Sequence, residues 1–260
     1  MPTTTADISA LYAGSKPVDK LYAGSTQIWT GLEDGGGLPL PGPEVIGAGA
    51  SVNNITGNFS MNPAYPTDYT AVADDYCLIC LNGILSNVPP NIALPSGYAK
   101  ATVNPIYDGS TGAFAWFFYK KLTASEAAPT FSAGTDCLGG LGAFLTIVRG
   151  IDGTTPLDAT PTGTGSADAA AATKIAPSIT PATEGALILC LAGTSGNNMP
   201  SLSVSQDFTV VKSGSTTIGN DFGHALASKL VATTDAVTGP TFSTSGACDW
   251  GIQTIALRPA

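Results

Sequence analysis

The chain has 260 residues, of which 43% are hydrophobic and only 11% are charged. Ten Lys and Arg stand against 19 Asp and Glu, so the formal net charge at pH 7 is −9. Such a chain lacks the basic face that nucleic-acid binding requires, because a bound phosphate backbone must be neutralised. The charged share is less than half of the usual quarter or so. This shortage favours a surface partly covered by neighbours in an assembly.

The start of the chain, Met1–Asp7, contains neither the basic stretch nor the apolar stretch of a secretory signal. No apolar run reaches the roughly 18 to 20 residues that are needed to cross a bilayer. We therefore expect synthesis and assembly in a cytoplasm, without membrane insertion.

Five cysteines at irregular spacing do not form a closed disulfide framework. Cys77 and Cys80 match a C-x-x-C pattern, but they lie in a strand-like run, where a spacing of three places side chains on opposite faces. Cys190 lies in an apolar run and is expected to behave as a small hydrophobic residue. The sequence predicts no metal site and no cofactor.

The N-terminal segment contains a repeat, in which LYAGSKPVDK (residues 11–20) is followed by LYAGSTQIWT (residues 21–30). Each copy predicts a short strand, a Gly-Ser turn and a second short strand. Some thirty residues bury too little apolar surface to be stable alone. We therefore interpret residues 1–30 as a docking arm; the alternative is a hairpin packed on its own domain. The predicted docking residues are the apolar and aromatic side chains Leu11, Tyr12, Val18, Leu21, Tyr22, Ile28 and Trp29.

Residues 31–43, GLEDGGGLPLPGP, have the Gly and Pro density of a linker. The remaining residues, 44–260, are called the body below. They contain runs rich in Val, Ile, Phe, Tyr and Leu between clusters of Gly, Pro, Asn, Asp and Ser, a pattern typical of β-strands. The predicted strands are Val45–Ala50, Tyr76–Leu81, Tyr98–Val103, Ala113–Lys121, Gly142–Arg149, Ala186–Ala192, Phe208–Lys212, Phe222–Lys229 and Trp250–Arg258. So many strands in one domain predict an all-β antiparallel sandwich with jelly-roll connectivity.

The arm resembles the Tyr-x-Gly-(Ser/Asp/Thr)-x-x-(Val/Ile)-Trp segment found near the start of many bacteriophage virion proteins. The body resembles a family of phage and environmental β-sandwich domains. The matching pieces are ADDYCLIC (73–80), FYKKLTASE (118–126), VRGIDGTTPLDA (148–159), PSITPATEGAL (177–187) and IALRPA (255–260). One departure is Gly97-Tyr98-Ala99, where such domains often carry Gly-Trp-Thr.

This resemblance implies a non-enzymatic structural protein of the virion, a capsid decoration or head-fibre module anchored by its arm to other virion proteins. It also implies a homo-oligomer, with a trimer favoured. Two alternatives stay open. One is a tail-fibre or baseplate adaptor, and the other is a module that binds host-surface glycan through aromatic side chains such as Tyr65, Tyr69, Tyr107 and Trp250.

Catalytic signatures are weak. The only histidine, His224, lies in a strand pattern with no evident nucleophile beside it. Carboxylate pairs, such as Glu126 with Glu184 or Asp74 with Asp75, are better interpreted as turn and strand-end residues than as a glycosidase pair. We therefore expect no enzymatic activity.

The segment Asp152–Asp158 offers several oxygens, yet it lacks the residue order of a calcium loop. We interpret it as a polar turn in which Asp side chains bind the backbone. Arg149, just before this turn, is expected to pair with Asp152 or Asp158.

Overall fold

The computed structural model describes four short segments of the arm and most of the body. The described ranges are residues 12–13, 16–17, 20–23, 26–30, 42–54, 60–85, 92–107, 112–132, 140–165, 171–195, 201–205, 207–216 and 221–260. The chain divides into two units, Met1–Pro41 and Gly42–Ala260.

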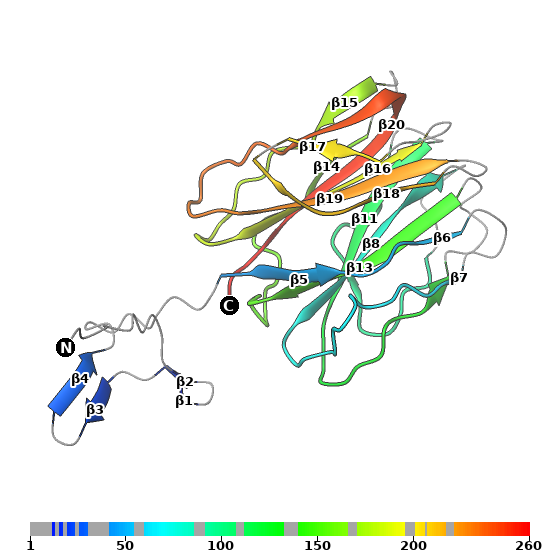
Figure 1. Cartoon of the computed structure of the whole chain (residues 1–260). Coiled ribbons are helices and arrows are strands. Elements are labelled where there is room, and N and C mark those ends of the chain that lie inside the picture. Colours follow the sequence, from blue (N-terminus) through cyan, green and yellow to red (C-terminus); the bar gives the residue numbers. More distant parts are fainter. Residues whose placement is uncertain are drawn as a thin grey trace, which may run out of the picture. The chain divides into compact units, whose positions relative to one another are not determined.

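The first unit contains one two-stranded antiparallel pair in each copy of the repeat (Figure 1). β1 (Tyr12–Ala13) pairs with β2 (Lys16–Pro17), and β3 (Lys20–Ala23) pairs with β4 (Thr26–Thr30). In both copies the Gly-Ser dipeptide stands between the paired strands in the sequence.

The second unit contains two seven-stranded antiparallel sheets (Figure 1). The first has the order β10-β11-β8-β13-β5, with β6 also beside β13 and β9 beside β11. Its strands are β5 (Glu44–Ala48), β6 (Val52–Asn54), β8 (Tyr76–Leu85), β9 (Ala99–Lys100), β10 (Ile106–Tyr107), β11 (Gly112–Lys121) and β13 (Gly140–Arg149). A separate short pair joins β7 (Ser60–Met61) to β12 (Phe131–Ser132).

The second sheet has the order β14-β20-β16-β19-β18, with β15 and β17 also beside β20. Its strands are β14 (Thr162–Gly165), β15 (Ala171–Ile175), β16 (Leu187–Ser195), β17 (Ser203–Val204), β18 (Thr209–Ser215), β19 (Phe222–Leu230) and β20 (Thr241–Leu257). The all-β antiparallel class is therefore confirmed. Jelly-roll connectivity is not confirmed, because each sheet takes its strands from one continuous half of the body instead of alternating between sheets.

The two sheets pack face to face around a mainly apolar layer. Leu78 and Cys80 of β8 lie in this layer with Leu189 and Leu191 of β16. Side chains alternate along each strand, so the neighbouring residues point to the outer faces. Those outer faces are covered as well, and this explains why the central strands are continuous apolar runs instead of alternating ones.

Connecting segments cover each outer face. On the first sheet, Trp116 and Phe118 of β11 pack beneath the segments around Met61 and Phe131. On the second sheet, Trp250 is completely buried among residues from its own strand and from the connections.

Two predicted strand positions were wrong. The segment Tyr98–Val103 is mostly turn and contributes only the two-residue strand β9. The last strand does not begin at Trp250 but at Thr241, and its Ser- and Thr-rich first half pairs with β15 and β17. That half has too few large apolar residues to stand out as a strand in the sequence.

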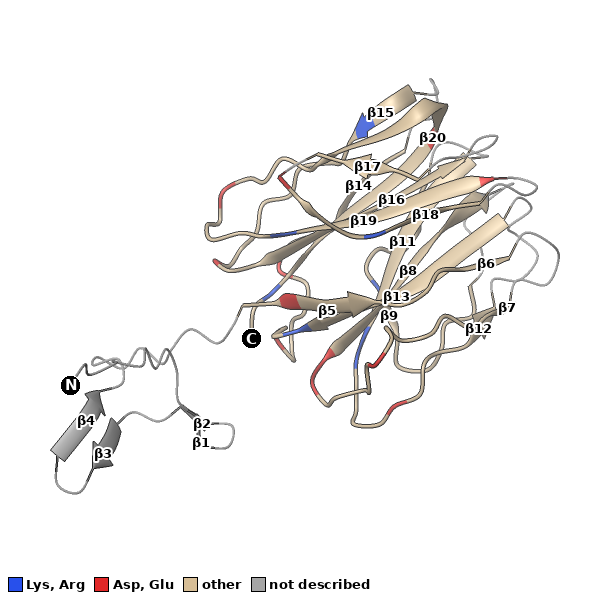
Figure 2. Ribbon diagram, in the orientation of Figure 1, with Lys and Arg blue, Asp and Glu red and all other residues tan. Residues whose placement is uncertain are grey.

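Charged residues are nearly absent from the middle of the sheets and gather towards the end of the sandwich that holds the start of β5 and the C-terminus (Figure 2). Within the described ranges, no helix is long and apolar enough to pass through a membrane.

Candidate functional site

The predicted docking residues belong to the first unit. Tyr12 lies in β1, Leu21 and Tyr22 lie in β3, and Ile28 and Trp29 lie in β4. Leu21 and Trp29 are direct register partners, and a β-bulge follows Leu21. The other two predicted residues, Leu11 and Val18, lie outside the described residues, as does the Gly/Pro linker up to Pro41.

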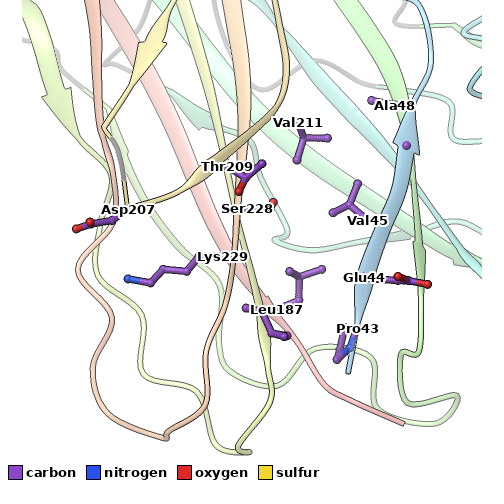
Figure 3. A pocket seen from close by; sticks show the side chains of 12 residues that line it. Pro43, Glu44, Val45, Ala48, Leu187, Asp207, Thr209, Val211, Ser228 and Lys229 are labelled. Carbon is purple, nitrogen blue, oxygen red and sulfur yellow. The ribbon is translucent and has the colours of Figure 1, made fainter. Parts of the chain in front are cut away.

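Where the body begins, an open groove of about 540 Å³ lies between β5 and the strands β18 and β19 (Figure 3). It thus lies between an edge strand of the first sheet and the facing edge of the second. Its floor is apolar and continues into the layer between the sheets through Val45, Leu187 and Val211. Glu44, Asp207 and Lys229 supply charge around it.

This groove has the chemistry of a contact surface. Leu230, which lines it, is 56% exposed, and Val210 of the same edge is 48% exposed. An edge strand also presents unpaired backbone N–H and C=O groups. Such a groove can take an extended apolar segment, but its charged groups do not converge on one point.

Among the residues that the structure describes, His224 of β19 has the surroundings that most suggest chemistry. Its Nε2 lies 2.8 Å from Oγ of Ser51, which is in the connection between β5 and β6. The ring is fully buried and stacks on Phe144 of the opposite sheet, with the ring centroids 5.2 Å apart. Ser51 and His224 therefore form a hydroxyl–imidazole pair, which the sequence did not reveal because 173 positions separate them.

The electrostatics of this pair do not match a Ser-His-Asp triad, in which a buried carboxylate holds the second ring nitrogen. Nδ1 of His224 has no hydrogen-bond partner among the described residues. Burial, together with the positive charge of Lys212, lowers the pKa of His224 to about 4. The neutral ring thus joins Ser51 to the second sheet and fixes the connection after β5.

The carboxylates that were considered as a catalytic pair each form a separate contact that stabilises the fold. Glu126 pairs with Lys120 and accepts hydrogen bonds from the backbone and hydroxyl of Thr123. Burial opposes ionisation of Glu126, but these hydrogen bonds outweigh it and lower the pKa. Asp74 pairs with Lys121 at an exposed position. These contacts fit the predicted roles at turns and strand ends.

The predicted partner of Arg149 was wrong. Its guanidinium binds both carboxylate oxygens of Asp75, at 2.8 and 2.9 Å, and neither Asp152 nor Asp158. The partner of Asp158 is instead Arg258, at 3.0 Å. Asp158 also accepts the backbone N–H groups of the segment before β16, at Ala182 and Thr183. Arg149 is thus joined directly to the residue before β8, whereas Arg258 is joined through Asp158 to the connection before β16.

The turn after Arg149 has the predicted form. Oδ1 of Asp152 accepts the backbone N–H groups of Thr154 and Thr155, at 2.8 and 2.6 Å. Such an Asx turn uses the carboxylate within the chain. Within the described ranges, no three His, Cys, Asp or Glu residues are placed to hold a metal ion.

Cys77 and Cys80 point to opposite faces of the first sheet, as predicted, and belong to different core layers. Burial raises the pKa of Cys77 to about 12, and it also raises that of Cys80. Cys190 is likewise buried, with a pKa raised to about 12 by burial. These thiols are core residues, and Cys137 lies outside the described residues.

The aromatic residues considered for glycan stacking have other contacts. Trp250 is buried and donates its indole N–H to the carbonyl of Ala171, at 2.8 Å. Tyr65 and Tyr69 pack edge to face, and the hydroxyl of Tyr69 donates to Asp75. These three side chains do not form an open stacking platform. Tyr107 is half-buried against the outer core of the first sheet.

No family model, no curated protein and no solved structure was found to match the chain.

Proposed function

We propose that the chain is a non-enzymatic structural protein of a bacteriophage particle, in which the body is anchored to other virion proteins by the N-terminal arm. The observation that carries the proposal is the division of the chain into two units at Pro41. Each repeat copy before this boundary forms its own strand pair, and the Gly/Pro linker leads into the body.

The chemistry of the body supports a structural role. The ionisable side chains that a hydrolase would use are engaged in fold-stabilising contacts, namely His224 with Ser51, Glu126 with Lys120, and Asp75 with Arg149. The body is a block with three apolar layers, one between the sheets and one on the outer face of each sheet. Such a block suits a decoration or fibre module, whose task is to occupy a surface.

The partner of the arm is a virion protein. It belongs to the capsid or, as the second candidate, to the tail or baseplate. A homo-oligomer, with a trimer favoured, belongs to the same proposal, because closed symmetric contacts are the rule in such assemblies. The groove beside β5 and β18 offers the body a second contact surface.

The test is to purify phage particles on a density gradient and to locate the protein with antibody-bound gold under negative stain. Labelling at regular capsid sites supports the decoration role, and labelling at the tail supports the adaptor role. Particles that contain no copy of the protein would overturn both.

A further inference from the structure

The two sheets of the body have the same internal connectivity. In chain order, the five strands on the main path of the first sheet are β5, β8, β10, β11 and β13, and those of the second are β14, β16, β18, β19 and β20. The spatial orders are β10-β11-β8-β13-β5 and β18-β19-β16-β20-β14. Each strand of one series therefore occupies the place of its counterpart in the other.

The pairing registers also agree. Tyr76, the first residue of β8, pairs with Lys121 and Val148. Leu187, the first residue of β16, pairs with Leu230 and Leu257. Lys121 and Leu230 are the last residues of β11 and β19. Aligning Tyr76 with Leu187 thus aligns the neighbouring strands as well.

The backbone at the entrance to the central strands is the same in both halves. Asp74 donates its N–H to the carbonyl of Leu122, and Leu122 donates to the carbonyl of Asp75. Gly185 and Val231 repeat the first of these bonds, and Val231 donates in turn to Ala186. Asp74 and Gly185 both have positive φ, 72° and 78°. A non-glycine residue rarely adopts this conformation, so its recurrence at the matched position is specific.

The connecting segments that cover the outer faces of the two sheets meet in corresponding places. In the first half, the connection before the central strand meets the connection after β11, through Met61 and Phe131. In the second half, the connection before the central strand meets the connection after β19, through Ile179 and Val237. Both contacts lie in the outer apolar layer of their own sheet.

Contacts between the sheets are reciprocal. Gly142 of β13 lies against the Phe222 ring at the start of β19. In the opposite direction, Gly251 of β20 lies against the backbone of Ala113 at the start of β11. By the register, Gly142 corresponds to Gly251, and Phe222 corresponds to Ala113.

A further contact between the sheets lies along the same strands. Phe144 of β13 stacks on His224 of β19. Its counterpart Gln253 of β20 binds Phe117 of β11, two residues beyond Ala115, which is the counterpart of His224. At the centre, a Cβ added to Gly193 would lie 3.0 Å from Cβ of Asn82, which is its own counterpart. In a two-fold interface, residue i contacts j while j contacts i, and residues on the axis contact their own copies.

We infer that the body consists of two copies of one sheet-forming module, joined in tandem and packed against each other as an isologous pair. The partner that fits the inner face of either sheet is a second copy of the same module. The residues have diverged: Asn82 faces Gly193, and Phe144 corresponds to Gln253. The arginines at the end of the last strands, Arg149 and Arg258, remain the same. This inference does not depend on the proposed virion function.

The test starts from the folded full-length protein and separates its two modules from each other. A protease site is inserted between Gly153 and Thr154, in the exposed turn that joins the modules. The folded chain is cut, and the fragments are separated in denaturant and refolded alone or together. The C-terminal fragment is decisive, because it carries no arm that could itself associate.

We expect the two fragments together to restore the original complex. The C-terminal fragment alone should sediment as a discrete species of twice its own mass. Leu191→Glu, which places a charge in the layer between the sheets, should return this fragment to the monomer mass, whereas Thr233→Glu at an exposed position should not.

A C-terminal fragment that joins the N-terminal fragment but never pairs with itself would overturn the inference. If the cut chain does not reassemble at all, a circularly permuted body (residues 44–260) decides instead. In that chain, a copy of residues 150–161 joins Ala260 to Glu44, and the new ends lie between Gly153 and Thr154. One cooperative melting transition is expected, and its loss would show that the two module connections are not equivalent.

Discussion

Gln253, in the last strand of the second sheet, binds the backbone of Phe117 in the first. Its Oε1 accepts the Phe117 N–H at 2.6 Å, and its Nε2 donates to the Thr102 hydroxyl at 2.7 Å. Gln253 is fully buried in the layer between the two sheets. A buried backbone N–H must be paired, and here the opposite sheet supplies the acceptor. This side chain therefore fixes the positions of the two sheets relative to each other.

Replacing Gln253 with Met retains the volume but removes both hydrogen bonds. The buried N–H of Phe117 is then left unpaired, so we expect the free energy of unfolding to fall by about 2 kcal/mol. Urea denaturation followed by tryptophan fluorescence measures the change. The control is Ile255→Met on the same strand and face, a volume-conserving swap that should cost less than about 1.5 kcal/mol. Equal losses in the two variants would contradict the bridging role.

Glycine at position 251 allows the sheets to approach closely. A Cβ added there would lie 2.5 Å from Cα of Phe114 and 2.7 Å from the carbonyl oxygens of Ala113 and Ile106. Backbone atoms cannot rotate away, so Gly251→Ala should lower the free energy of unfolding by about 2 kcal/mol or more. Gly246→Ala, in the same strand but with open space around it, should change it by no more than about 0.5 kcal/mol. Thermal melting of the two variants side by side checks this difference.

His224 makes the fold sensitive to acid. Its pKa is about 4 in the folded protein and about 6.5 when unfolded. Protonation therefore favours the unfolded chain, so this contribution is fully present above pH 6.5 and is lost as the pH falls towards 4. Between pH 7 and pH 4.5, the native protein should lose about 2 kcal/mol more stability than His224→Gln. Parallel pH profiles for the two proteins would show that the imidazole is not buried.

Asp158 joins the C-terminal segment to the connection before β16 at the charged end of the sandwich. Its buried carboxylate binds Arg258 and the backbone N–H groups of Ala182 and Thr183. These hydrogen bonds outweigh the effect of burial and lower its pKa. Asp158→Ala leaves the partly exposed guanidinium of Arg258 and two backbone donors without their acceptor, so it should cost about 2 kcal/mol in chemical denaturation. Asp235→Ala, at an exposed turn, is the control and should stay within about 0.5 kcal/mol. A similarly small effect at Asp158 would exclude this joining role.

The sequence predicted the fold class and most long strands, because these depend on local composition. Segments such as Ala113–Lys121 and Gly142–Arg149 are apolar throughout, and only strands covered on both faces tolerate this. The placement of the Cys77 and Cys80 side chains on opposite faces of the sheet followed from strand geometry alone. Connectivity did not follow, because no local pattern states which strands share a sheet.

Long-range polar contacts could not be predicted for the same reason. Arg149 was assigned to the nearest carboxylates in the chain, whereas its partner, Asp75, precedes it by 74 positions. Ser51 and Gln253 are ordinary residues in the sequence and become important only when the two sheets are placed together. The docking residues of the arm, by contrast, were identified as the apolar and aromatic side chains of its two repeat copies, and their role stays a prediction.

The proposal that the arm anchors the body to the virion is tested most directly by rebinding. Full-length protein and a chain lacking residues 1–43 are mixed with phage particles stripped of this protein, and co-sedimentation is measured. We expect the full-length chain to rebind and the shortened chain, with its body still folded by circular dichroism, to remain in solution. Equal rebinding of both chains, or rebinding of neither, would contradict anchoring through the arm.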